Sequence, residues 1–196
     1  MQPTTDAPRR LCLLGGESSG KTTLARALAE ALGTLWVPEY GRELWERMRR
    51  TLNAEELVQV AQRQVELEDR AQPRACGWLV CDTSPLTTLQ YCLHDHAQAP
   101  AELRALARRS YDATVVCLPD FDFVQDGCRR DEAFRTEQHQ WTLARLAEMG
   151  VTPLIVQGST AQRLGQLIEH LAKTDWATSA QNPAPRRAAM ALNKDE

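Results

Sequence analysis

The sequence predicts an α/β fold, with a five-stranded, mostly parallel sheet and helices on both faces. Three observations carry this prediction. Short apolar runs alternate with amphipathic segments along most of the 196 residues. The first apolar run leads through a glycine-rich turn into a helix, which is how a βαβ unit begins. The run Gly77–Cys81 is apolar throughout, as expected of a strand that is covered on both faces.

The strands are predicted where short apolar runs are bounded by turn residues, at 10–14, 34–37, 77–81, 113–118 and 152–156. The helices are predicted between them, where apolar residues recur three and four positions apart, at 21–32, 41–50, 53–72, 85–94, 100–109, 132–149 and from Ser159 to about Lys173. Gly33 and Gly150 are placed to end two helices, and Pro73 ends a third. Ser84 is placed to cap the helix that starts at Pro85. Crossovers between such parallel strands are right-handed.

Composition excludes several classes of protein. The chain is 43% apolar and 25% charged, which is enough to bury a core without disulfide or metal cross-links. Its net charge of −3 argues against nucleic-acid binding through a general basic field. The first apolar run, Leu11–Leu14, is far shorter than the roughly 18 residues that span a bilayer, so we expect no membrane association and a cytoplasmic location. We expect residues 1–8 to be flexible, residues 9–173 to form one domain, and residues 174–196 to be a disordered tail.

The glycine-rich turn carries the most specific motif. Residues Gly15, Gly16, Glu17, Ser18, Ser19, Gly20, Lys21 and Thr22 fit the pattern G-x-x-x-x-G-K-[ST] between a strand and a helix, which is the P-loop of P-loop NTPases. Backbone N–H groups of such a turn and the positive end of the helix attract phosphate. Lys21 is expected to contact the β- and γ-phosphates, and Thr22 to bind Mg²⁺. ATP and Mg²⁺ are therefore the expected cofactors, with Thr23 completing the ATP-binding segment.

The rest of the chain favours one class of P-loop protein. A G protein has D-x-x-G after its third strand, whereas this chain has Asp82-Thr83-Ser84-Pro85. The chain is also short for a motor or remodelling ATPase. A small-molecule kinase fits better, because such enzymes close an arginine-bearing lid that excludes water. The polar segment 119–131 is the candidate lid.

Four residues are the expected catalytic groups: Lys21, Asp82, Glu39 and Arg129. Asp82 ends the third strand, where a carboxylate can hold Mg²⁺ beside the P-loop. Glu39 follows the second strand and can accept the proton of an acceptor hydroxyl. Arg129 and its neighbour Arg130 can reach the phosphates from the lid. Sequence alone leaves the base open between Asp82 and Glu39.

Aromatic residues near these positions can stack on a flat ring. Trp36 and Tyr40 flank the end of the second strand, and Phe121 and Phe123 lie in the candidate lid.

Four runs, in order, resemble the kinase domain of NadR-type ribosylnicotinamide kinases. They are LLGGESSGKTTL at the P-loop, PEYGREL at 38–44, CDTSPLTTLQYC at 81–92 and DFVQDGCR at 122–129. The resemblance covers roughly residues 10–170. It implies ATP- and Mg²⁺-dependent phosphorylation of nicotinamide riboside at its 5′-hydroxyl, which gives nicotinamide mononucleotide for NAD salvage. The residues then expected to bind the acceptor are Glu39, Tyr40, Arg42, Trp36, Asp82 and Asp126.

The chain departs from the family pattern in three ways. Ser84 stands where many relatives carry a second aspartate, and Pro38 stands where relatives can carry a tryptophan. The larger members also have an N-terminal adenylyltransferase domain, which we do not expect in this chain.

Two alternatives stay open. One is another nucleoside or nucleotide kinase on the same scaffold. The other is a regulatory P-loop ATPase that acts through a protein partner and phosphorylates no metabolite. A small-molecule acceptor is the expected partner, and the sequence gives no oligomeric state.

Overall fold

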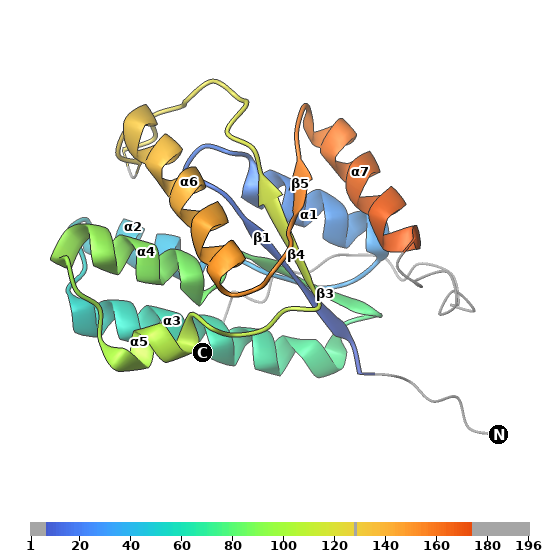
Figure 1. Ribbon diagram of the computed structural model, residues 1–196. Coiled ribbons are helices and arrows are strands. Elements are labelled where there is room, and N and C mark those ends of the chain that lie inside the picture. The colour runs from blue at the N-terminus through green and yellow to red at the C-terminus, as the bar shows by residue number, and fades with distance from the viewer. Residues whose placement is uncertain (1–6, 128, 174–196) are drawn as a thin grey trace.

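The computed structural model describes residues 7–127 and 129–173. Its strands are β1 (Arg9–Leu14), β2 (Trp36–Val37), β3 (Trp78–Asp82), β4 (Ala113–Cys117) and β5 (Leu154–Val156). Its helices are α1 (Lys21–Leu32), α2 (Tyr40–Met48), α3 (Ala54–Ala71), α4 (Pro85–His96), α5 (Ala101–Leu106), α6 (Glu132–Glu148) and α7 (Thr160–Lys173), with a 3₁₀ turn, η1 (Gln72–Arg74), after α3. The strands form one sheet in the order β2-β3-β1-β4-β5, and every pairing is parallel (Figure 1). The predicted α/β fold is confirmed, with a wholly parallel sheet over the described residues.

Local signals set most element boundaries. Asn53 and Glu56 form a reciprocal capping box at the start of α3, in which each side chain accepts the backbone N–H of the other residue. Ser84 caps α4 as predicted, accepting from the N–H of Leu86. Gly33 ends α1 in the left-handed conformation, with φ of +61°. The helix predicted over 100–109 is shorter, because only Ala101–Leu106 is α-helical.

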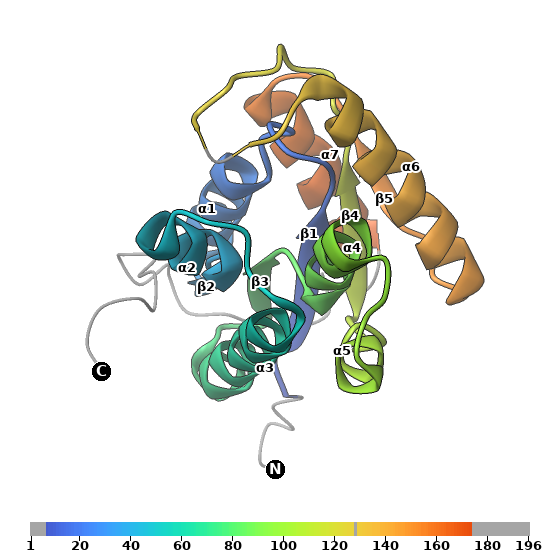
Figure 2. The same ribbon diagram turned by 90° about the vertical axis from the view of Figure 1, so that its left-hand side faces the viewer.

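The sheet separates two hydrophobic cores. Leu11 and Leu13 of β1 belong to the core shared with α1 and α7. Cys12 and Leu14, which alternate with them, belong to the core shared with α3, α4, α5 and α6. Helices therefore cover both faces of the sheet, as Figures 1 and 2 show.

Because every strand runs in the same direction, the carboxyl ends of all five strands lie together at one end of the sheet. The turn between β1 and α1 and the ends of β2 and β3 meet there. The segment between β4 and α6 arches over it, seen in yellow in Figure 2. A ligand crevice is expected at this end of an open parallel sheet.

The expected flexible segment 1–8 and tail 174–196 fall largely on residues 1–6 and 174–196, which lie outside the described residues. Within residues 7–127 and 129–173, no helix is both long and apolar enough to cross a lipid bilayer.

Candidate active site

The phosphate loop is built on glycines that no other residue replaces without strain. Gly15 has φ of +141°, and a Cβ there would lie 2.7 Å from the carbonyl oxygen of Cys117. Gly20 has φ of +77°, and a Cβ there would lie 2.8 Å from the ring of Phe121. Both positions need the positive φ and the missing side chain of glycine. The loop therefore curls tightly against the end of β4.

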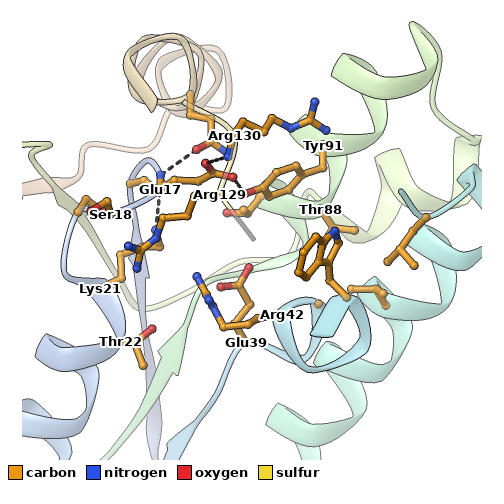
Figure 3. A pocket seen from close by; sticks show the side chains of 18 of the residues that line it. Glu17, Ser18, Lys21, Thr22, Glu39, Arg42, Thr88, Tyr91, Arg129 and Arg130 are labelled. Carbon is orange, nitrogen blue, oxygen red and sulfur yellow. Dashed lines mark hydrogen bonds between the residues drawn. The ribbon is translucent and has the colours of Figure 1, made fainter. Parts of the chain in front are cut away.

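Lys21 lies folded over this loop. Its Nζ donates to the carbonyl oxygens of Gly15 and Gly16, each at 2.8 Å. An ammonium held by carbonyls at this position can exchange them for phosphate oxygens, which carry far more negative charge. Thr22, one residue on, presents its hydroxyl at the same edge of the cavity (Figure 3).

A cavity of about 430 Å³ extends from the phosphate loop to helices α2, α3 and α4. Figure 3 shows Lys21 and Thr22 on one side, Glu39 and Arg42 below, Thr88 and Tyr91 opposite, and the lid arginines above. Its described lining residues are Gly15 and 17–23 of the phosphate loop and α1, Glu39, Gly41, Arg42 and Trp45 around α2, Thr51, Leu52, Leu57 and Val60 before and on α3, Thr87, Thr88, Tyr91 and Asp95 on α4, and Gly127, Arg129, Arg130 and Gln138 of the lid and α6. Its size is that of a small-molecule site.

Glu39 is the acid that lines this cavity between the phosphate loop and α2. It occupies the N-cap position of α2, but its side chain makes no capping bond. The backbone is held instead by Gln64 of α3, whose Oε1 accepts from the N–H of Tyr40 at 3.0 Å. The carboxylate is thus left to face the cavity.

Asp82 ends β3 and is almost fully buried beside Thr22. Its Oδ1 has no hydrogen-bond partner among the described residues. Burial, and then repulsion from Glu39, raise the pKa of Asp82 to about 6, whereas Thr22, Lys21 and Arg42 oppose the rise. A buried carboxylate with an orphaned oxygen is costly unless a cation is bound.

Asp82 and Thr22 fit a Mg²⁺ ion that is carried in with nucleotide. Such an ion takes one or two protein oxygens and completes its shell with phosphates and water. Among the described residues, no group of three or more His, Cys, Asp or Glu side chains forms a metal site made by the protein alone. The carboxylate of Asp82 and the hydroxyl of Thr22 therefore suit a Mg²⁺ ion that arrives bound to the nucleotide.

The lid segment comprises residues 119–127 and 129–131, and it packs on the phosphate loop. The N–H of Val124 donates to Ser18 Oγ at 3.1 Å. Asp126 bridges two cavity arginines, because its carboxylate lies 3.1 Å from Arg42 Nη1 and 3.4 Å from Arg129 Nε. Arg130 pairs with Asp95 of α4.

Four of the predicted acceptor residues are not among those that line the cavity, and Asp82, buried at the end of β3, is one of them. Trp36 is 8% exposed and packs in the core of α1 and α7, on the far side of the sheet. Tyr40 packs against the other core, and Asp126 acts through Arg42 and Arg129. The expectation that Trp36 stacks on the acceptor is corrected, because its indole is buried on the far side of the sheet; stacking by Tyr40, which is only partly buried, stays a prediction.

Phe121 and Phe123 are not among the described cavity residues either. Their rings lie under the guanidinium groups of Arg163 and Arg135, 4.4 and 5.5 Å from the ring centroids. Arg135 of α6 is 4% exposed and donates to the carbonyl of Phe121 at 2.7 Å. These rings and arginines hold the lid in place.

The sequence interpretation missed Trp45, Tyr91 and Arg163. Trp45 lies one helical turn after Gly41 and Arg42, so all three share the cavity face of α2. Arg163 is 1% exposed and donates to the carbonyl of Ser19 at 2.6 Å, which ties α7 to the phosphate loop. Its signal was the i, i+4, i+8 stripe with Leu167 and Leu171, which placed a cation on a buried face.

A family model described as an AAA domain matches residues 10–163. The chain belongs to this AAA-domain family.

Several solved structures share the fold of this AAA-domain protein. A NadR protein in complex with NR is 22% identical, with a TM-score of 0.66 over 84% of this chain and 52% of its own. A NadR protein in complex with NAD and AMP-PNP is 21% identical, with a TM-score of 0.66 over 84% of this chain and 50% of its own. Thymidylate kinase from Candida albicans is 15% identical, with a TM-score of 0.61 over 86% of this chain and 92% of its own. This chain spans about half the length of the NadR proteins.

Proposed function

We propose that the protein is an ATP-dependent kinase that phosphorylates the 5′-hydroxyl of nicotinamide riboside to give nicotinamide mononucleotide. One observation carries the proposal: a single cavity runs from the phosphate loop, past the carboxylate of Glu39, to apolar side chains of α2 and α3 and the segment between them. A phosphate donor and a nucleoside acceptor can thus meet in one enclosed space. The shared fold with NadR proteins, one of them bound to NR, supports this acceptor.

The acceptor end suits a flat ring attached to a sugar. Trp45, Leu52, Leu57 and Val60 provide apolar surface for the ring. Glu39, Thr88 and Tyr91 provide polar groups for sugar hydroxyls. The ring therefore lies against α2 and α3, which directs the sugar toward the phosphate loop.

Each site residue then has a part in an in-line transfer of the γ-phosphoryl group. Lys21 and the backbone of the phosphate loop hold the donor phosphates. Glu39 accepts the proton from the attacking hydroxyl, because its carboxylate faces the cavity while that of Asp82 is buried next to Thr22. Bound Mg²⁺, held through Thr22 and Asp82, neutralises charge on the transferring group. Arg129 stabilises the same charge from the lid.

The test is product formation from a panel of acceptors. With ATP and Mg²⁺, we expect nicotinamide riboside to give nicotinamide mononucleotide, detected by mass spectrometry, faster than thymidine, uridine, thymidylate or shikimate react. Lys21→Ala should lower the rate by about 10²–10³-fold or more, since it removes a fixed charge from the transition state. Lys173→Ala is the matched control, because this exposed lysine of α7 pairs only with Glu169 among the described residues.

The outcomes separate the alternatives. Preferential phosphorylation of thymidine or thymidylate would replace the proposed acceptor with another on the same scaffold. ATP hydrolysis that no acceptor on the panel alters would favour a regulatory ATPase.

A further inference from the structure

Glu17 is an acidic residue inside a loop that binds phosphate, where a carboxylate aimed at the ligand would repel it. The structure turns its side chain away from that position. Its Oε1 accepts from the hydroxyl of Tyr91 at 2.8 Å, and its Oε2 accepts from the backbone N–H of Arg130 at 2.7 Å (Figure 3). Its own N–H donates to Oε1 of Gln138 at 2.9 Å. One residue of the phosphate loop is thus bonded to α4, to the lid and to α6.

The burial of this residue indicates a built contact. Glu17 is 8% exposed, and a charge is stable at such a place only if it is well hydrogen-bonded. Burial raises the pKa of Glu17, while the hydrogen bonds from Arg130 and Tyr91 oppose the rise. Both carboxylate oxygens are used, each by a donor from a different element.

The Arg130 contact lies at the arginine-bearing end of the lid. The Arg130 guanidinium pairs with Asp95 and lies 4.7 Å from the centroid of the Phe134 ring. Its N–H, fixed by Glu17, is one residue from Arg129, the lid arginine assigned to the transferring group. The position of Arg129 over the cavity therefore depends on this anchor.

We propose that Glu17 is a positioning residue that fixes the arginine-bearing end of the lid and the Tyr91 wall of the cavity to the phosphate loop. The inference rests on the proposed phosphoryl transfer for its consequence, since a lid held in register excludes water while the acceptor reacts. Without Glu17, the lid end separates from the loop, Arg129 is misplaced and water reaches the donor phosphate.

The first test measures the contact itself and needs no catalysis. In Glu17→Ala, the amide of Arg130 loses a charged acceptor, so we expect its hydrogen exchange to be at least about tenfold faster. Tyr91→Phe, which keeps the ring and removes only the hydroxyl, should give a smaller change in the same direction. Glu30→Ala, on the exposed face of α1, is the matched control and should leave this exchange unchanged.

The second test measures coupling in the whole enzyme. We expect Glu17→Ala to lower kcat for transfer by about 10- to 100-fold and to raise ADP formation without acceptor relative to transfer. The KM for ATP should stay close to that of the wild type. A raised ATP KM with unchanged kcat would place Glu17 on the nucleotide and overturn the proposal.

The two tests distinguish this inference from the proposed function. If the wild type phosphorylates no acceptor, the proposed function fails, and the exchange of the Arg130 amide still decides the contact. If that exchange is unchanged in both Glu17→Ala and Tyr91→Phe, Glu17 does not anchor the lid, whatever the protein phosphorylates.

Discussion

At the scale of single residues, Asp82 and Glu39 show how burial separates two carboxylates. Asp82 is 1% exposed with an orphaned Oδ1, whereas Glu39 is half-buried at the cavity wall. A fully buried carboxylate serves as a fixed anion for a cation, and a carboxylate at the cavity wall can reach a hydroxyl. We therefore propose Glu39 as the base and Asp82 as the carboxylate that holds the cation.

We predict opposite effects of Asp82→Asn on stability and activity. Asparagine keeps the shape and removes a charge that burial disfavours, so the free energy of unfolding should rise by about 1–3 kcal/mol at neutral pH. The transfer rate should fall by about 10²-fold or more, because the negative charge assigned to the cation is gone. Urea denaturation and a coupled ADP assay measure the two quantities.

Glu39→Gln is the contrast for this prediction. Glu39 is only partly buried, so the variant should lose activity without gaining stability. If Asp82→Asn is active, or is less stable than the wild type, the buried carboxylate has another role.

At the scale of elements, the acceptor end is made by the packing of α2 on α3. Helix α2 has no fully buried residue of its own, and Gly41 lies against Val60 so that the helices approach closely. This packing puts Trp45 beside Leu52 and Leu57. The aromatic wall of the cavity thus comes from α2, at the residue that directly follows the PEYGREL run at 38–44.

We predict that Trp45→Leu weakens the acceptor and leaves the donor unchanged. Loss of a ring that stacks on the acceptor should raise the acceptor KM by about tenfold, with the ATP KM unaltered. Binding of the acceptor should also quench tryptophan emission in the wild type and not in the variant. Trp141→Leu, on α6 beneath Arg145, is the matched control. Equal acceptor KM values in Trp45→Leu and wild type would remove Trp45 from the site.

At the scale of the whole molecule, the sequence predicted the fold class better than the site, although it gave no strand order. Alternating apolar runs and the glycine turn were enough for the sheet and the phosphate loop, because both depend on local patterns. The directions of the Trp36 and Glu39 side chains were not predictable. Strand β2 has only two residues, Trp36 and Val37, which is too short an alternation to show which face lies toward the cavity. The roles of Arg163 on α7 and Trp45 on α2 were missed because tertiary packing decides which face of each helix meets the core or the cavity.

The amino ends of the strands, opposite the site, hold a polar network that supports the fold. Glu68 of α3 is fully buried, accepts from Arg109 Nε at 2.9 Å and from the Tyr111 hydroxyl at 3.0 Å. Asp69 accepts from Arg10 of β1 at 3.0 Å and pairs with Arg109 as well. The network ties α3 to β1 and to the segment before β4. None of these side chains lines the active-site cavity. Gln64, however, donates to Glu68 Oε1 at 3.4 Å and accepts from the N–H of Tyr40, so the network also supports the start of α2.

We predict that Arg109→Met lowers the free energy of unfolding by about 3 kcal/mol above pH 8, because the raised pKa of Glu68, about 8, leaves its carboxylate charged there and the variant buries that charge without its cation. Arg109→Met combined with Glu68→Leu should recover most of this loss, since both charges are then absent. Arg108→Met, the exposed neighbour, is the control.

Burial raises the pKa of Glu68, and a proton that the folded state holds more tightly adds stability at low pH. The stability lost in Arg109→Met should therefore be small at pH 5–6, where Glu68 is protonated in both folded proteins, and should grow as pH rises through about 8, in urea denaturation. A loss that is the same at every pH, or that the double variant does not recover, would mean that Arg109 acts through packing and not through the charge of Glu68.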